Sequence, residues 1–534
     1  MKVLLVNPPT PQTFWSFDNV MKLTGKKALI PPLGLLTVAA FLPETWEVKL
    51  VDQTFQTVSQ DDWVQCDVVL VSGMIVQQEG ILSAIQEAKG RGKTVIVGGP
   101  WAFHFPDKAV AAGADIVVVG EAEPVMPEVL DAVRNGGSGK IIHCRVRAAM
   151  DKSPTPRYDL LNINAYLDMA VQFSRGCPFH CEFCDITLML GRKVRTKTPE
   201  QILKELQLLY DLGWRRSVFF VDDNFIGNPL RTRHLLQELI PWSESHGDPF
   251  EFYTQASVNL AAEPELLDAM VKAGFFQVFL GIETQDAGSL KSAGKMQNAV
   301  VDLDRVCRKI NEAGLQIIAG CILGFDNEQP GAGKRLIDFA VRNQIPEMYV
   351  SLLQATPGTE LWQRLEREQR LIDSNFEDFY NQTALTNFVP TRPIEEIADE
   401  LIQLYATLYE NESFLSRSLE HRLRVKRRPV PKPFKMPYFW ELSAVLITII
   451  RQGILYPSRR KFWKSLFRLM RQRPEGLVKF LVYCMKAEHY LEFRQTVASK
   501  LRPQMDLVKN KATIAGEGRD EVCLDDTCQA ITGR

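Results

Sequence analysis

Short β-branched runs alternate with helical stretches over most of the chain, and this alternation constrains the fold more than any other feature. In the first series the runs are Lys2–Asn7, Val48–Asp52, Asp67–Ser72, Thr94–Gly98 and Asp115–Gly120. The pattern predicts parallel strands joined by helices, and therefore a doubly wound α/β sheet over residues 1–140. No G-x-G-x-x-G follows the first strand, which argues against a dinucleotide-binding fold.

The carboxyl ends of these predicted strands are where a ligand would bind in such a sheet. Small residues at these ends allow a bulky, flat cofactor to approach the backbone closely. The candidate binding residues are Ser72, Gly73, Gly98, Gly99, Gly120 and Glu121.

A second series of strand and helix patterns occupies residues 166–390. Its predicted strands are Met169–Phe173, Ser217–Val221, Phe250–Gln255, Gln277–Gly281, Gln316–Leu323 and Met348–Leu353. Six such units predict a partial (β/α)6 barrel, in which the working residues stand at the carboxyl ends of the strands. Those ends carry Asp222, Asn224, Gln255, Glu283 and Gly324. Asp, Asn and Gly also favour plain turns, so a strand-end turn is the alternative for these positions.

Three cysteines follow the first barrel strand at C-x3-C-x2-C spacing: Cys177, Cys181 and Cys184. Three thiolates on one tight loop can hold three corners of a 4Fe–4S cluster and leave the fourth iron without a protein ligand. An open metal position indicates chemistry rather than a structural role. The alternatives are a structural zinc site with His180 as fourth ligand, or three unrelated cysteines.

This spacing, with Phe183 directly before the last cysteine, resembles the signature of the radical S-adenosylmethionine (radical SAM) superfamily. The resemblance implies that the open iron binds SAM and that the reduced cluster cleaves it to a 5′-deoxyadenosyl radical. It also implies that Asp222, Asn224 and Glu283 contact the SAM amino group or ribose. Gly324 and the backbone at Phe183 would lie beside the adenine, and Gln255 is a further candidate contact.

The N-terminal segment resembles the cobalamin-binding domain of cobalamin-dependent radical SAM enzymes. The similarity rests on Pro31–Leu35, Ser72-Gly73, Gly98-Gly99-Pro100 and Gly120–Glu123. The D-x-H-x-x-G motif that supplies a histidine to cobalt is absent, which leaves the lower cobalt ligand open. We expect His104, which lacks that context, to be a surface or capping residue. The alternative is a vestigial α/β domain with a purely structural role.

The remaining segments are a linker at residues 141–165, a helical region at 391–505 and a polar tail at 506–534 that we expect to be disordered. Within the helical region, an apolar run at Phe439–Ile450 precedes Arg459–Arg471, where cations alternate with aromatic and aliphatic residues. This combination fits helices lying in a membrane interface. A helical cap packed on the barrel, covering the substrate entrance, is the alternative.

Composition indicates the cellular compartment and argues against one class of partner. The formal net charge of -1 and the lack of a recognised binding module argue against nucleic acid as a partner. The other cysteines are scattered, which is typical of a reduced cytosolic protein. No signal peptide pattern is present, and no apolar run reaches the ~18 residues of a membrane span. We therefore expect a cytoplasmic protein, either free or peripheral at the inner face of the membrane.

The whole chain resembles the cobalamin-binding radical SAM proteins with a long helical C-terminal extension, which include hopanoid C-2 methyltransferase and the bacteriochlorophyll ring-substituent methyltransferases. Pro8–Phe17 and Pro32–Ala40 carry much of this similarity. It implies methylation of an unactivated carbon on a hydrophobic substrate, first a hopanoid-type lipid, with a reductase, ferredoxin or flavodoxin as electron donor. The alternatives are a radical SAM cyclase or oxidoreductase, and a non-catalytic iron–sulfur adaptor at the membrane surface.

Overall fold

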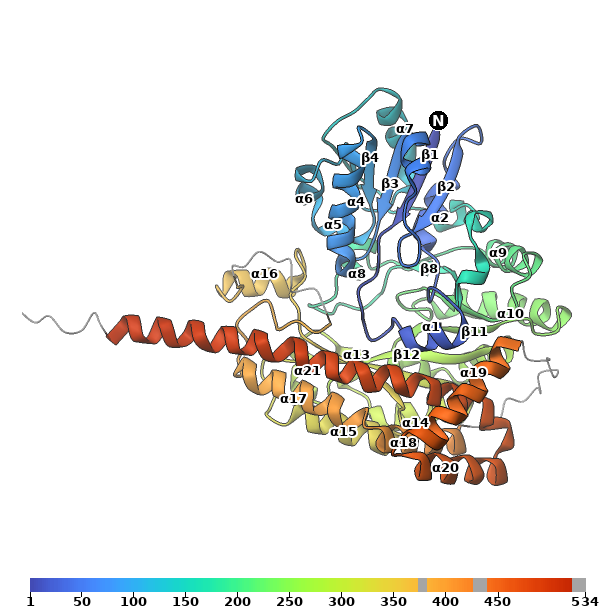
Figure 1. The fold of residues 1–534 in the computed structure, drawn as a ribbon, viewed down its shortest axis with the longest axis vertical. Helices are drawn as coiled ribbons and strands as arrows, with labels where there is room; N and C mark the ends of the chain where they lie inside the picture. Colours follow the sequence, from blue (N-terminus) through green and yellow to red (C-terminus); the bar gives the residue numbers. More distant parts are fainter. Residues whose placement is uncertain (373–381, 426–438, 521–534) are drawn as a thin grey trace, which may run out of the picture.

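The computed structural model describes residues 1–372, 382–425 and 439–520 of the chain. An N-terminal α/β domain lies above a second sheet with its helices, and further helices from the C-terminal part run below and beside that sheet (Figure 1). The side chains of residues 439–441 and 507–520 are not described.

The N-terminal sheet is parallel throughout, with strand order β2-β1-β3-β4-β5-β6. Its strands are β1 Lys2–Asn7, β2 Glu47–Asp52, β3 Val68–Ser72, β4 Thr94–Gly98, β5 Ile116–Val119 and β6 Lys140–His143. The first five were predicted. The sixth was not, because it is a short edge strand in which Ile142 alone is fully buried.

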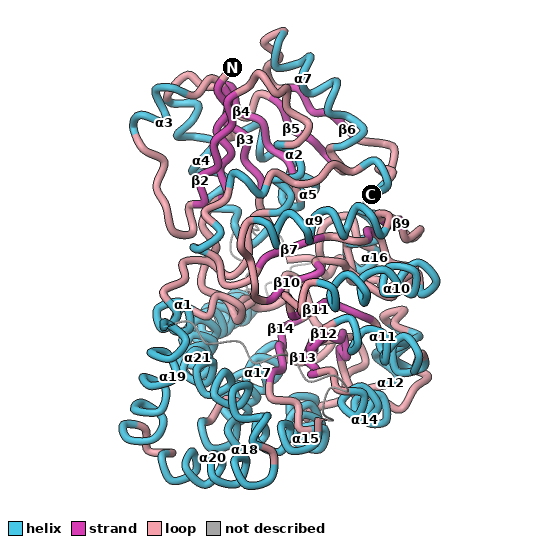
Figure 2. Tube along the Cα trace, turned by 90° about the vertical axis from the view of Figure 1, so that its right-hand side faces the viewer, coloured by secondary structure: helices cyan, strands magenta, loops and turns pink. Residues whose placement is uncertain are grey.

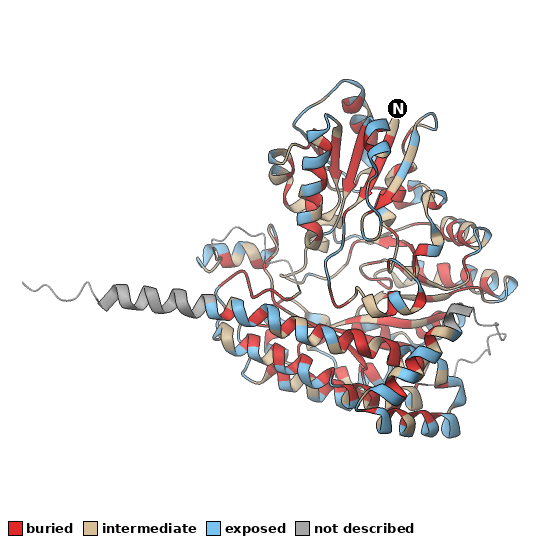
Figure 3. Ribbon diagram, viewed as in Figure 1, coloured by how far each residue is buried: buried red, intermediate tan, exposed pale blue. Residues whose placement is uncertain are grey.

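Both faces of this sheet are covered by helices, as a doubly wound sheet requires. On one face, Leu4 and Val6 pack with α4 Gln78–Gly90, α5 Pro100–His104 and α6 Pro106–Ala111. On the other, Val3 and Leu5 pack with α2 Leu33–Ala39 and α7 Met126–Arg134. The central strands β1, β3, β4 and β5 are accordingly mostly buried, whereas the edge strands β2 and β6 are partly exposed (Figure 3).

The second sheet is also parallel, with order β14-β13-β12-β11-β10-β7. Its strands are β7 Met169–Val171, β10 Ser217–Phe220, β11 Glu251–Ala256, β12 Phe275–Glu283, β13 Gln316–Leu323 and β14 Glu347–Leu352. The outer helices are α9 Pro199–Asp211, α10 Pro229–Ser245, α11 Pro264–Ala273, α14 Leu303–Ala313 and α15 Ala332–Asn343. This arrangement confirms the predicted partial barrel (Figure 2).

The region predicted as a linker is closely attached to both domains. It contains three single-turn helices: η3 Met150–Lys152, η4 Tyr158–Leu160 and η5 Ile163–Ala165. The hydroxyl of Tyr158 donates to the Ala170 carbonyl at 2.7 Å, and that of Tyr166 donates to Asp52 at 3.0 Å. These contacts join the N-terminal sheet to the first barrel strand.

The C-terminal helices cover the open side of the barrel. They are α17 Ile394–Leu408, α18 Asn411–Arg424, α19 Phe439–Ile450, α20 Arg459–Gln472 and α21 Leu477–Asp520. The Tyr405 hydroxyl accepts from the Val350 amide at 3.1 Å and donates to the Val350 carbonyl at 2.8 Å, and Tyr409 does the same at Met348 at 2.8 and 2.7 Å. Two tyrosines therefore satisfy backbone groups on the outer edge of β14.

The N-terminal loop also reaches this helical layer. Phe14 is fully buried and stacks on Tyr490 of α21, with ring centroids 4.8 Å apart. His489 Nε2 lies 3.0 Å from the Phe14 carbonyl oxygen. Helix α21 is thus packed against the N-terminal loop as well as against α17. Helix α21 continues to Asp520, into the segment predicted as a polar tail, whose last residues, 521–534, lie outside the described residues. Among the helices of the described ranges, none has the length and apolar character needed to cross a membrane.

Candidate active site

The cysteine loop, which carries Cys177, Cys181 and Cys184, follows β7. It is held by a two-stranded antiparallel sheet of β8 Ser174–Arg175 and β9 Arg195–Thr196. Gly176 has φ 96°, and a Cβ there would stand 2.8 Å from the Gly191 carbonyl oxygen and 3.0 Å from that of Lys193. Only glycine combines this left-handed backbone with such a close approach. The loop is therefore held in a fixed shape against the segment that returns to β9.

The three cysteine side chains lie together, half-buried, on this loop. Burial raises the pKa of each thiol above its usual value, while the nearby Lys295 ammonium lowers it for all three. The Nδ2 of Asn224 lies 3.9 Å from Cys177 Sγ, and the Nε2 of Gln297 lies 3.9 Å from Cys181 Sγ. A cation and two amides turned toward the sulfurs suit thiolate ligands of an iron–sulfur cluster, so the residues present fit this group.

His180, the alternative zinc ligand, is half-exposed, and its Nε2 lies 2.9 Å from Glu360 Oε1. Across the described ranges, no three His, Cys, Asp or Glu side chains are arranged to hold a single metal ion.

Lys295 and Glu283 form a buried ion pair beside the cysteine loop, with Nζ 2.6 Å from Oε1. Burial alone would lower the pKa of Lys295, but the Glu283 carboxylate and the Cys181 thiol raise it above its usual value. Glu283 adopts φ 65°, a strained conformation for a non-glycine residue at the end of β12. The Lys295 ammonium also lies 6.0 Å from the centroid of the Phe183 ring. The structure thus holds one carboxylate and one ammonium ion next to the cluster loop.

The other predicted SAM contacts divide into two groups. Asn224 reaches the cluster loop, and Phe183 packs edge-on against Phe325, at 5.7 Å, where β13 ends. Asp222 instead lies behind the loop, fully buried, and accepts from the Phe173 amide at 2.8 Å and from Ser174 Oγ at 3.0 Å. Burial raises the pKa of Asp222 to about 7 against these hydrogen bonds. Its observed contacts fasten the strand that precedes the cysteines.

Gln255 and Gly324 both stand at strand ends, as predicted. The Gln255 carbonyl accepts from the Phe225 amide at 2.9 Å, and its side chain is half-buried. Gly324 has φ 96°, and its amide donates to Glu328 Oε2 at 2.9 Å. Glu328 is a buried carboxylate that sequence reasoning missed, because it lies beyond the strand end in a loop.

The carboxyl edge of the N-terminal sheet is lined by backbone rather than by side chains. Ser72 and Gly98 are paired in register at this edge, and a Cβ at Gly98 would have nothing nearer than Val118 Cβ at 3.8 Å. Gly99 and Gly120 have φ 86° and 105°, a region that glycine adopts without strain. Gly73 lies against the Gln77 and Ile81 side chains. A glycine-rich edge of this kind fits a flat cofactor.

Glu121 has a different environment from the other residues predicted at this edge. Its two carboxylate oxygens accept from the Arg195 guanidinium, both at 2.8 Å, and Oε2 also accepts from the Ala148 amide at 2.5 Å. Arg175 pairs with the neighbouring Glu123 at 2.7 Å. Both arginines are therefore ion-paired across the domain boundary.

His104 corrects the expectation of a surface residue. Its side chain is buried, with Nε2 3.0 Å from Asp185 Oδ2 and Nδ1 3.2 Å from the Pro357 carbonyl oxygen. Arg147 also donates to the Leu188 carbonyl in α8 Ile186–Leu190, at 2.7 Å. These contacts set the carboxyl edge of the N-terminal sheet directly over the cysteine loop.

The barrel interior is lined by aromatic rings. Along β10, β11 and most of β14, fully buried residues that face the outer helices alternate with half-buried residues that face inward. Phe219 and Tyr253 stack at 4.6 Å, and Trp15 from the N-terminal loop lies 5.9 Å from both Phe279 and Tyr349. The inward position next to Phe279 is Gly320, where any side chain would collide with that ring. The inner side of the barrel strands is therefore largely aromatic.

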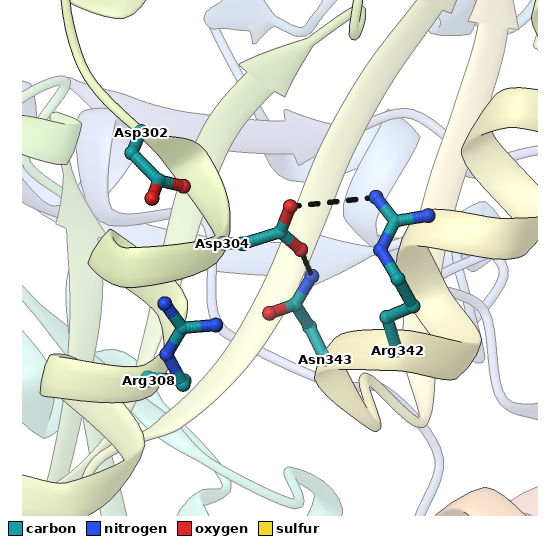
Figure 4. Close-up of a pocket in the computed structure, with 5 residues that line it drawn as sticks. All are labelled: Asp302, Asp304, Arg308, Arg342 and Asn343. Atoms are coloured by element: carbon teal, nitrogen blue, oxygen red, sulfur yellow. Dashed lines mark hydrogen bonds and ion pairs between the residues drawn. The ribbon is translucent and has the colours of Figure 1, made fainter.

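A separate polar hollow lies between α14 and α15, on the outer helical layer (Figure 4). Asp304 at its centre bonds to Asn343 and lies 3.4 Å from Arg342. The hollow is lined by Asp302, Asp304, Arg308, Arg342 and Asn343, and none of these was predicted as a site residue.

Comparison with known proteins agrees with this geometry. The model of the radical SAM superfamily matches residues 171–340, and that of the B12 binding domain matches residues 26–130. A domain of unknown function (DUF4070) matches residues 359–502. The hopanoid C-2 methylase of Rhodopseudomonas palustris is 33% identical over 93% of this chain and 94% of its own length. The chain belongs to the cobalamin-dependent radical SAM methyltransferases.

Other members share the same full-length organisation. An uncharacterized methyltransferase of Synechocystis sp. is 46% identical over 95% of this chain and 94% of its own. The structure of the radical SAM methyltransferase TsrM from Kitasatospora setae, which holds cobalamin and a 4Fe–4S cluster, superposes with a TM-score of 0.60 at 14% identity. That match covers 93% of this chain and 99% of TsrM. The cofactors of this methyltransferase are accordingly a 4Fe–4S cluster, SAM and cobalamin.

Proposed function

We propose that this methyltransferase adds a methyl group to an unactivated carbon of a hydrophobic, polycyclic substrate, with a hopanoid-type lipid as the first candidate. The observation that carries the proposal is the 33% identity, over nearly the full length of both chains, to the hopanoid C-2 methylase of Rhodopseudomonas palustris.

The barrel interior supports a substrate of this class. Phe219, Tyr253, Phe279 and Tyr349 come from four different strands and all face inward, and Trp15 packs against two of them. Aromatic faces bind large apolar ring systems by area burial and exclude water from a radical reaction. Among these rings the Tyr253 hydroxyl donates a hydrogen bond to Asp168 at 2.9 Å.

The residues at the strand ends position the cofactors. When bound, the cluster with SAM supplies hydrogen-atom abstraction, and cobalamin supplies the methyl group. Cys177, Cys181 and Cys184 would hold the cluster, while Glu283 and Lys295 would offer opposite charges to the amino and carboxylate groups of SAM. The N-terminal sheet edge, from Ser72 to Gly120, would present cobalamin to the same space through the docking contacts of His104 and Glu121.

The proposed partners follow from this chemistry. The substrate is a small hydrophobic molecule, and reduction of the cluster requires a ferredoxin, flavodoxin or dedicated reductase. The protein would work in the cytoplasm or at the inner face of the membrane, where such a lipid is available.

The decisive test uses the reconstituted holoenzyme, prepared without oxygen, with SAM carrying a deuterated methyl group and a lipid extract from a strain in which the gene is deleted. The proposal predicts a hopanoid that gains a labelled methyl group, together with 5′-deoxyadenosine. Label-free products with altered hydrogen content would instead indicate a cyclase or oxidoreductase. Absence of both 5′-deoxyadenosine and cluster absorbance would indicate a non-catalytic adaptor.

A further inference from the structure

The outermost C-terminal helices present a continuous apolar surface to solvent. Helix α19 runs into a π-helical turn, η7 Arg451–Leu455, and α20 packs beside that turn. Leu446, Ile454 and Phe467 are 59%, 60% and 61% exposed, so they face solvent and not the core. Seven exposed residues form this surface, called the outer apolar face: Leu442, Leu446, Ile447, Ile450, Ile454, Phe467 and Met470.

The inner and outer sides of α19 differ sharply. Its inner side packs into the protein: Ala444 is buried, and Val445 and Ile449 contact the hydrophobic core. Thr448 donates to the Ala444 carbonyl at 2.7 Å, and Gln452 in η7 donates to the Cys484 carbonyl of α21 at 3.3 Å. The outer side, from Leu442 to Ile450, bears only leucine and isoleucine. The packing needs of the fold therefore explain the inner side and leave the outer side without a function.

Helix α20 continues the same surface. The Trp463 indole donates to the Gly453 carbonyl at 2.9 Å and stacks on Phe467 at 5.7 Å. Met470 follows Phe467 by three residues, so Trp463, Phe467 and Met470 form one stripe of α20 next to η7. This contact joins the apolar stripes of the two helices into one face.

A row of cations lies beside this face. Helix α20 contains Arg459, Arg460, Lys461, Lys464, Arg468 and Arg471 and no acidic residue. Arg468 pairs with Glu420. Arg460, Lys464 and Arg471 are exposed, and none has an acidic partner among the residues that the structure describes. Their spacing of four and seven residues places them on the stripe adjacent to Phe467 and Met470.

We propose that the outer apolar face, with the cations of α20, docks this methyltransferase on an anionic phospholipid surface. The aliphatic residues of α19 and η7 would enter the boundary between headgroups and acyl chains, and Arg460, Lys464 and Arg471 would lie among the phosphates. An aliphatic ridge alone would also suit another protein. The unpaired cation row along its border is the charge complement of lipid phosphate, and it selects the membrane. This docking is independent of the methylation chemistry.

The test is cosedimentation of the full-length holoenzyme, under anaerobic conditions, with vesicles of phosphatidylcholine alone or with about one third phosphatidylglycerol. We expect binding to the anionic vesicles that weakens with salt. Leu446→Asp/Ile450→Asp should reduce the partition coefficient about tenfold or more, and Arg460→Gln/Lys464→Gln/Arg471→Gln should reduce it by a similar factor at low salt.

Matched controls lie elsewhere on the surface. Val64→Asp/Leu230→Asp changes two apolar residues that are 75% and 76% exposed, and Lys2→Gln/Lys49→Gln/Lys334→Gln removes three exposed cations. Both controls should bind vesicles like the unmodified protein. Cluster absorbance and SAM cleavage should be unchanged in all four variants, which separates failure of docking from loss of folding or of catalysis.

Absence of binding to anionic vesicles would overturn the proposal, as would equal binding by the docking variants and their controls. Sedimentation equilibrium examines the remaining occupant: a self-association that Leu446→Asp/Ile450→Asp abolishes, without vesicle binding, would assign the face to a second copy of the chain and would also overturn it.

Discussion

The imidazole of His104 bridges the two cofactor domains: its Nε2 lies 3.0 Å from the carboxylate of Asp185, the residue that directly follows Cys184. His104 ends the helix that begins at the carboxyl edge of β4, and Asp185 begins the helix that leaves the cysteine loop. One buried contact therefore couples the glycine-rich edge of the N-terminal sheet to the cluster loop. In the proposed reaction, methyl transfer to the substrate depends on that relative position, because misplacement by about 1 Å costs orders of magnitude in rate.

Replacement of His104 should uncouple the two half-reactions. His104→Ala is expected to lower the yield of methylated product per 5′-deoxyadenosine about tenfold, with SAM cleavage largely retained. His104→Gln, which keeps a nitrogen near Asp185, should recover much of the coupling. The measurement is the ratio of the two products by mass spectrometry. His143→Ala, at an exposed position of the edge strand β6, is the control. Equal ratios for His104→Ala and this control would contradict the positioning role.

The three loop cysteines should be individually essential. Cys177→Ala, Cys181→Ala and Cys184→Ala should each lose the cluster absorbance and the reductive cleavage of SAM, because each removes one of the three proposed iron ligands. Iron and sulfide content after anaerobic reconstitution measures the first effect. Cys66→Ala, a buried cysteine of the N-terminal domain, should keep both. A variant of the loop that still formed 5′-deoxyadenosine would refute the assignment.

The Lys295–Glu283 pair should show strong coupling. Lys295→Met leaves a buried carboxylate without its counter-ion and should lower the free energy of unfolding by about 3 kcal/mol. Glu283→Gln added to Lys295→Met should recover part of this loss, since the double variant buries no charge. Both variants should bind SAM more weakly. Denaturant titration and SAM binding isotherms measure these effects, with the exposed Lys291→Met as control. Additive losses in the double variant would argue against the pair.

His421 should contribute to acid sensitivity. Burial lowers the pKa of this histidine to about 3, well below the usual 6.5. The stabilising effect of the neutral ring is complete above pH 6.5 and is lost as the pH falls toward 3, because the unfolded chain takes up a proton first. Between pH 7 and pH 5 the loss is about 2 kcal/mol. His421→Asn should remove that part of the pH dependence, as measured by denaturant unfolding at the two pH values. An unchanged slope would refute it.

The sequence predicted what depends on local pattern. The strands of both sheets carry continuous or alternating apolar residues, and the C-x3-C-x2-C spacing indicates ligands of an iron–sulfur cluster. Lys295 escaped notice because it lies between two short helices, where a lysine is normally solvated. His104 was misjudged because its partners, Pro357 and Asp185, are 253 and 81 residues away in the chain. Glu121 was expected at a cofactor, but its arginine partner lies 74 residues further on. Contacts between domains leave no local signal.

Tyr405 and Tyr409 affect how this protein folds during its synthesis. The strand that Tyr405 seals is made 55 residues earlier. During translation the barrel emerges from the ribosome before these tyrosines. Until they are made, the backbone groups at the edge of β14 are unpaired and can bond to another extended chain. A truncated protein that ends before Tyr405 would keep this strand edge exposed. We therefore expect the two cofactor domains to aggregate when they are produced without the C-terminal helices.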